Sequence, residues 1–277
     1  MPILKRDNAV IHFQETGSGS PLMLLHGFSV TSAYWSKPGV TGRLARRYRV
    51  IAPDLRGHGR THVNGAPLGF DVDTMVEDIH ALAAALTMER FHLVGHSMGG
   101  MVAVRYALRY SPGLLSLTLI GTGSATAFGG GDPRLRRQGL ELFAQLYERF
   151  TWDQLFTHLR SIPGPLLYHL NFHPERERLW GLLEEISREN DPKTLGAFAR
   201  SFFTDPDPRL EELRRIQCPT LVLLGDHDKL FISSSAELAR EIPEARQVLM
   251  SRVGHMTALE APERTSQEIL AFLAELP

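Results

Sequence analysis

The feature that most constrains this chain is the stretch of residues 91–100, FHLVGHSMGG. An apolar run typical of a buried strand ends in the pattern Gly-x-Ser-x-Gly, and a helix-like segment follows from Met98. A sharp strand-to-helix turn holds Ser97 in strained backbone geometry and exposes its hydroxyl. Gly95 and Gly99 flank the serine because strand and helix pass too close there for a Cβ. The segment therefore predicts a nucleophile elbow with Ser97 at its tip.

Two later segments supply possible partners for this serine. Residues 220–228 predict an apolar strand that runs into two acids, and residues 247–255 predict a strand that ends at His255. On folds with such an elbow, the chain order is serine, then acid, then histidine. This sequence keeps that order. We therefore predict that Ser97, one of the two acids and His255 meet at the strand ends of one sheet.

Length and composition agree with a globular enzyme. A chain of 277 residues with 43% hydrophobic content buries a large core, and its formal net charge of -1 argues against nucleic acid as a partner. No apolar run approaches the roughly 18–20 residues of a membrane span, and residues 1–8 lack the apolar core of a signal peptide. Cys218 is the only cysteine, which precludes an internal disulfide. We expect a cytoplasmic protein without a membrane segment.

Apolar strand-like segments alternate with helix-like segments along most of the chain. Such near-continuous apolar strands, separated by helices, predict an α/β fold with a mostly parallel central sheet flanked by helices on both faces. Helices are expected over residues 72–86 and 98–110 and from Pro262 to the end. The strands are expected at residues 3–5, 10–13, 22–25, 48–52, 91–95, 115–120, 220–228 and 247–255.

The alternation stops between residues 125 and 215, where helical periodicity continues without a convincing buried strand. We interpret residues 125–215 as a helical cap insertion in a core formed by residues 1–124 and 216–277. A separate domain is the alternative, but the acid and the histidine lie beyond it, so the core must resume. Ligands of open α/β sheets bind at the carboxyl ends of the strands, and we expect the insertion to lie over those ends.

The chain resembles the α/β-hydrolase superfamily, in its capped, esterase-like branch, over nearly its whole length. The resemblance implies Ser97 as the nucleophile, Asp228 as the acid and His255 as the base. It also implies an oxyanion hole made by the backbone amides of Phe28 and Met98. The motifs that carry the resemblance are His26-Gly27-Phe28, DLRGHG at 54–59, GHSMGG at 95–100, GDHD at 225–228, and Gly254-His255 followed by EAPE at 260–263.

These residue types fit acyl transfer. A serine hydroxyl is a poor nucleophile until a base takes its proton, and a histidine both accepts that proton and returns it to the leaving group. A carboxylate on the other ring nitrogen fixes the tautomer. Asp228 is favoured over Asp226 because the family pattern places the acid later. Losing one oxyanion donor costs about 3–4 kcal/mol. Phe28 contributes its N–H, so its side chain is expected to matter less than the turn.

Four further side chains are tentative members of a substrate pocket: Trp35, His96, Phe143 and Trp152. Trp35 either walls the pocket or packs the core, and His96 either touches substrate or fills the elbow. No grouping of His, Cys, Asp and Glu has metal-ligand spacing, and no glycine motif that cradles phosphate is present. We therefore expect neither a metal nor another cofactor.

The predicted function is a serine hydrolase that cleaves small-molecule carboxylic esters through an acyl-enzyme. Enol-lactonases and cofactor-free haloperoxidase-like perhydrolases share the Ser-Met-Gly-Gly elbow and stay open as alternatives. Hydrolases of C–C bonds usually carry an aromatic residue after the catalytic histidine, where this chain has Met256. A low-turnover signal receptor of the same fold is the non-enzymatic alternative, which a turnover assay separates. The sequence predicts neither the natural substrate nor the oligomeric state.

Overall fold

The computed structural model describes residues 2–66, 68–127 and 132–276. Within these residues, nine strands form one sheet in the order β1-β2-β4-β3-β6-β7-β8-β9, and β5 pairs with β2 outside this path. β2 pairs antiparallel with β1 and β4, whereas all pairs from β4 to β9 are parallel, so the expected mostly parallel sheet is confirmed. The strands are β1 (Ile3–Arg6), β2 (Ala9–Thr16), β3 (Ser20–Leu25), β4 (Tyr48–Pro53), β5 (His62–Val63), β6 (Phe91–His96), β7 (Leu114–Ile120), β8 (Thr220–Gly225) and β9 (Arg246–Met250).

Helices cover both faces of this sheet. Along β3, Leu25 packs in one buried cluster and its neighbour Leu24 in another, as expected for a strand buried on both sides. The cluster of Leu25 includes residues of α3 (Val72–Ala85), α4 (Met98–Tyr110) and α11 (Ile232–Glu241). The cluster of Leu24 includes residues of α1 (Ala33–Ser36), α2 (Val40–Leu44), α12 (Thr257–Glu260) and α13 (Pro262–Ala274).

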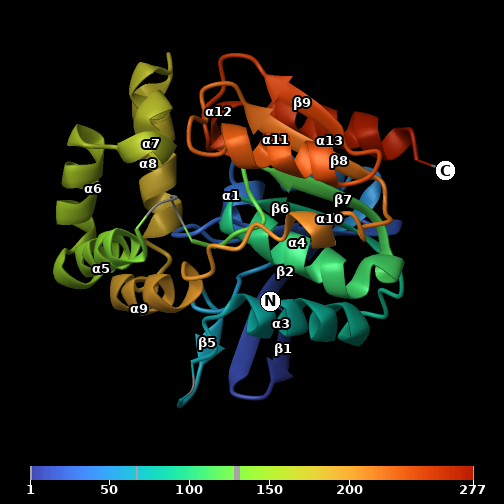
Figure 1. The fold of residues 1–277 in the computed structure, drawn as a ribbon, viewed down its shortest axis with the longest axis horizontal. Helices are drawn as coiled ribbons and strands as arrows, with labels where there is room; N and C mark the ends of the chain where they lie inside the picture. Colours follow the sequence, from blue (N-terminus) through green and yellow to red (C-terminus); the bar gives the residue numbers. More distant parts are fainter. Residues whose placement is uncertain (1, 67, 128–131, 277) are drawn as a thin grey trace.

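Between β7 and β8 the chain forms helices of which those at residues 133–202 lie together beside the sheet, whereas the short helix at residues 210–213 lies next to α11 (Figure 1). Local signals set their starts: Asp191 accepts the Thr194 N–H as the N-cap of α9, and Thr151 and Gln154 form a capping box on α6. Among the described residues, no helix is both long and apolar enough to cross a membrane. The helices of this segment are α5 (Pro133–Arg149), α6 (Trp152–Ser161), α7 (Gly164–Leu167), α8 (Arg176–Ser187), α9 (Pro192–Phe202) and α10 (Leu210–Leu213), with short 3₁₀ turns at Tyr168–Phe172 here and at Ser111–Gly113 before β7.

The last strand is shorter than the sequence predicts. β9 ends at Met250, and the chain turns at Arg252, whose φ is 61°. The carboxylate of Asp226 closes this turn by accepting the Arg252 N–H at 2.7 Å. The predicted strand over residues 247–255 is therefore wrong in its second half, because a polar turn replaces the ladder. His255 consequently lies on a loop rather than at a strand end.

Candidate active site

Ser97 lies at the tip of the turn between β6 and α4. Its φ of 53° and ψ of -119° fall where non-glycine residues are rarely found, which confirms the strained geometry expected for this serine. The end of β7 fixes the turn from two directions. The Ser97 N–H donates to the Ile120 carbonyl at 2.9 Å, and the Thr122 hydroxyl donates to the Ser97 carbonyl at 2.7 Å.

The glycines that flank Ser97 are required by close approach of the backbone. A Cβ on Gly95 would lie 2.4 Å from the Gly99 carbonyl oxygen, and a Cβ on Gly99 would lie 2.5 Å from the His26 carbonyl oxygen. Both distances are too short for real atoms. The strand and the helix therefore pass as closely as the sequence predicts.

Asp228 and His255 meet in the interior. Asp228 Oδ2 lies 2.7 Å from His255 Nδ1, and the side chains are 1% and 3% exposed. Asp226 faces the turn after β9 and contacts the backbone there. The structure thus brings Asp228, and not Asp226, to the histidine. A carboxylate on Nδ1 leaves Nε2 of the imidazole to exchange protons with a substrate or nucleophile.

His96 connects the elbow to the loop of His255. Its Nε2 donates to the His255 carbonyl at 2.9 Å, and the two rings lie 4.8 Å apart. Burial lowers the pKa of His96 well below its usual value, so the ring is neutral. The ring of Tyr34 also stacks on His96, with ring centroids 4.6 Å apart. Because His96 directly precedes Ser97, this bond places the loop of His255 next to the elbow.

The Gly27–Phe28 peptide lies against the elbow, since a Cβ on Gly27 would be 3.2 Å from Ser97 Cβ. His26 orients this peptide. Its Nε2 accepts the Leu55 N–H at 2.9 Å, so its Nδ1 carries the proton and donates to the Gly27 carbonyl at 2.7 Å. The C=O and N–H of a trans peptide point in opposite directions, so the Phe28 N–H is directed away from His26.

The second expected amide belongs to Met98, the first residue of α4. Amides of the first helical turn have no partner within the helix, and the helix dipole favours negative charge at this end. The Ser97 side chain does not cap the helix. The amide of Met98 therefore suits an anion that forms beside Ser97.

The Phe28 side chain packs against the helices between β7 and β8. Its ring centroid lies 5.5 Å from Phe143 and 5.2 Å from Tyr147 of α5, and 5.9 Å from Phe198 of α9. The expectation that the Phe28 side chain matters less than the turn stays a prediction, and the side chain has a further contact, between the sheet region and these helices. No motif marks it, since the packing partners come from distant positions in the chain.

The four tentative pocket residues take different positions. Phe143 lies on Phe28, and the partly buried Trp152 lies 6.4 Å from Tyr147 in the same aromatic group. Trp35 has no exposed surface and packs in the core cluster, which is the second of its two expected positions. His96 is also buried and fills the elbow.

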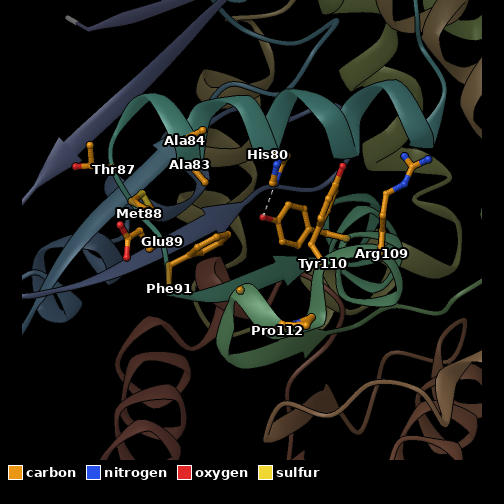
Figure 2. Close-up of a pocket in the computed structure, with 12 residues that line it drawn as sticks. His80, Ala83, Ala84, Thr87, Met88, Glu89, Phe91, Arg109, Tyr110 and Pro112 are labelled. Carbon is orange, nitrogen blue, oxygen red and sulfur yellow. Dashed lines mark hydrogen bonds between the residues drawn. The ribbon is translucent and has the colours of Figure 1, made fainter.

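A cavity of about 550 Å³ opens between α3 and the C-terminal end of α4 (Figure 2). His80 stacks on Tyr110 at its wall, with ring centroids 4.0 Å apart. Ser97 precedes the first residue of α4, whereas Arg109, another wall residue, lies in the last turn. A helix of 13 residues is about 20 Å long, so this cavity is remote from the serine. Within the described residues, no group of three or more His, Cys, Asp or Glu side chains is placed to hold a metal ion.

Comparison with known proteins identifies the family of this chain. A family model described as the alpha/beta hydrolase fold matches residues 20–262. The chain belongs to this family. It is similar, with 30% identity over 96% of this chain and 91% of the relative, to a 2-hydroxy-6-oxononadienedioate/2-hydroxy-6-oxononatrienedioate hydrolase of Paraburkholderia phymatum.

Two further similar proteins differ in how much of their length this chain covers. The chain is 32% identical over 92% of its length to the dihydrolipoyllysine-residue acetyltransferase component of an acetoin cleaving system from Pseudomonas putida, but spans 64% of that protein. Its structure is similar to a thermophilic esterase from Thermogutta terrifontis, with 26% identity, a TM-score of 0.79, and coverage of 97% of this chain and 94% of that chain. Membership in a family of hydrolases is therefore shown.

Proposed function

We propose that this chain is a carboxylesterase that cleaves small-molecule esters through an acyl-enzyme on Ser97. The observation that supports this most directly is the buried contact of 2.7 Å between Asp228 and His255, next to a serine in strained geometry. Relatives that include an esterase support the class of reaction.

In the proposed reaction, His255 takes the proton of Ser97 as the serine oxygen attacks the ester carbonyl. The amides of Phe28 and Met98 stabilise the oxyanion of the tetrahedral intermediate. His255 then protonates the leaving alcohol as the intermediate collapses to the acyl-enzyme. In the second half, His255 takes a proton from a water molecule as the water oxygen attacks the acyl carbon, and it returns that proton to Ser97 as the carboxylic acid leaves. Asp228 holds the imidazole in one tautomer and stabilises its protonated form.

We further propose that residues 125–215 act as a cap over this site and select the substrate. The support is the packing of Phe143, Tyr147 and Phe198 against Phe28, the residue whose amide would bind the oxyanion. An apolar wall at that position binds a hydrocarbon group by burial while the sheet region performs the chemistry.

A fluorophosphonate probe tests the nucleophile. Mass spectrometry should find one probe on the peptide that contains Ser97, and Ser97→Ala should lose both labelling and ester turnover. Ser18→Ala, at an exposed serine between β2 and β3, is the control and should still be labelled at Ser97. Labelling at another residue, or full activity of Ser97→Ala, would refute the proposal.

A substrate panel tests the reaction class. Esters, lactones, an enol-lactone, a C–C cleavage substrate and a peroxide-dependent halogenation assay should be compared at one enzyme concentration. We expect the highest kcat/KM for simple esters. Higher activity on another member of the panel would replace esterase by that class, and labelling of Ser97 without turnover on any of them would favour the receptor alternative.

A further inference from the structure

The loop that carries His255 is held by a buried carboxylate outside the triad. Glu260, the last residue of α12, has a side chain that is 1% exposed. Its Oε2 accepts the Gly254 N–H at 2.8 Å, and its Oε1 accepts the Met256 N–H at 3.0 Å. These two amides stand on either side of His255. Bonds from backbone N–H groups to an ionised carboxylate are among the stronger hydrogen bonds in proteins.

This contact replaces support that the sheet does not provide. β9 ends at Met250, so the loop that holds His255 has no strand ladder of its own. Other bonds hold the His255 ring through Asp228, its carbonyl through His96 and the Thr257 N–H, and the Val253 carbonyl through the His227 N–H. Glu260 holds the two amides before and after the histidine.

A residue of the proposed cap reaches the same carboxylate. His169, in the 3₁₀ turn that follows α7, places Nδ1 2.6 Å from Glu260 Oε2. Its Cβ also lies against the loop, because a Cβ on Gly254 would be 2.6 Å from it. The His169 ring stacks on His227 with centroids 4.4 Å apart and an interplanar angle of 22°. His227 directly precedes Asp228, so His169 contacts the loops of both the acid and the base.

We infer that Glu260 is a positioning residue for His255, and that His169 docks the cap onto the catalytic loops through this carboxylate. The inference rests on the proposed function, since it assigns the two residues to the support of the proposed base. Glu260 touches no reacting atom. It sets the position of the imidazole relative to Ser97, and His169 ties that placement to the cap by adding a donor to the same oxygen.

The first test compares Glu260→Gln with the matched control Glu263→Gln. A glutamine keeps the size of the side chain but turns an NH₂ group toward one of the two backbone donors. Glu263 is an exposed carboxylate on α13 that pairs with Arg43 and has no bond to the loop of His255. We expect Glu260→Gln to lower kcat about 100-fold, the cost of a misplacement near 1 Å, with KM nearly unchanged. Glu263→Gln should change neither.

The labelling rate of Ser97 separates this inference from the proposed function. A wild-type chain that is not labelled at Ser97 would defeat the proposed function. If the wild type is labelled and Glu260→Gln is folded by circular dichroism but reacts at the same rate, only the positioning role is defeated. A Glu260→Gln variant with a raised KM and an unchanged kcat would also defeat it, because substrate binding would then be the affected step.

The second test uses the cap, and it stays decisive if Glu260→Gln does not fold. His169→Ala should lower kcat about tenfold, through loss of a hydrogen bond to a charged group. The control is His173→Ala, a half-buried histidine at the end of the same turn whose ring accepts the Glu175 N–H rather than contacting the catalytic loops. Because His169 acts through Glu260, the double variant should be no slower than Glu260→Gln alone. Wild-type kcat in His169→Ala, or losses that add in the double variant, would overturn the docking role.

Discussion

The sheet region and the helices at residues 125–215 fix their side chains by different means. The candidate catalytic groups are held by buried polar contacts with the backbone or with each other, such as the bonds of Thr122 to Ser97 and of Asp228 to His255. The helices are joined by apolar packing, with Ala144, Leu195 and Phe198 fully buried, and by half-buried ion pairs such as those of Arg200 with Glu141 and Glu148. Apolar packing excludes water but does not fix polar atoms at set distances from one another.

The two regions also differ in the surface they leave to solvent. Of the nine large hydrophobic side chains that are exposed in the described part of the chain, five lie in this helical segment, namely Leu135, Leu142, Ile162, Tyr168 and Phe172. The difference indicates that buried polar contacts fix the candidate catalytic groups, whereas the helical segment leaves more apolar surface open to solvent. The predictions below test this division, from the largest expected effect to the smallest.

The largest effect should come from the buried acid. Asp228→Asn removes the charge that fixes the His255 tautomer, and kcat should fall about 10⁴-fold. Asp226→Asn is the matched control, because its side-chain oxygen still accepts the Arg252 N–H that closes the turn after β9. Its kcat should stay near wild type. Steady-state kinetics of the two variants decide the assignment, and a greater loss in Asp226→Asn would reverse the two acids.

Acid should destabilise the sheet region through its buried histidines. Burial lowers the pKa of His58 and His96 well below the usual 6.5, and it also lowers the pKa of His26. Below pH 6.5 the unfolded chain therefore binds more protons than the folded one. The free energy of unfolding should fall by about 1.4 kcal/mol per pH unit for each such histidine as the pH drops below that value.

Urea unfolding at pH 7.5, 6.5, 5.5 and 5.0 measures this slope. His58→Phe removes one of the buried groups and should make the fall shallower, whereas His62→Ala, at an exposed position on β5, should leave the slope unchanged. Equal slopes in the wild type and His58→Phe would show that these histidines do not control acid stability.

Local signals predict the sheet region well, and long-range contacts account for what they miss. Apolar strands, flanking glycines and chain order give the elbow and the candidate triad before any coordinates are known. They do not give the position of His255, because the turn after β9 depends on the distant Asp226. They also miss the contact of His169 with Glu260, which joins positions 91 residues apart with no shared pattern. Trp35 shows a third limit, since a core tryptophan and a pocket tryptophan look alike in sequence.

The smallest effect, and the one that tests the helical segment, is selectivity for acyl length. If Phe143 and its neighbours form an apolar wall beside the oxyanion site, each added CH₂ contributes up to about 0.8 kcal/mol, or about fourfold in kcat/KM, until the pocket is full. We therefore expect p-nitrophenyl esters of roughly four to eight carbons to be preferred over acetate and over long lipid chains.

Phe143→Ala should shift this optimum to longer chains, because it removes a ring that lies 5.5 Å from Phe28. Phe172→Ala is the control, since Phe172 is an exposed ring in the 3₁₀ turn after α7 that contacts Tyr168 rather than Phe28. Its optimum should match the wild type. Equal shifts in both variants would mean that the helices act on selectivity through their overall stability.

The wild-type series alone also has two outcomes that contradict the proposal. A steady rise of kcat/KM to long chains would indicate an open, lipase-like surface, and an optimum at acetate would indicate a small closed pocket. Either result would refute the proposed apolar wall. The assignment of the triad would be unaffected, because the labelling of Ser97 and the Asp228→Asn variant test it separately.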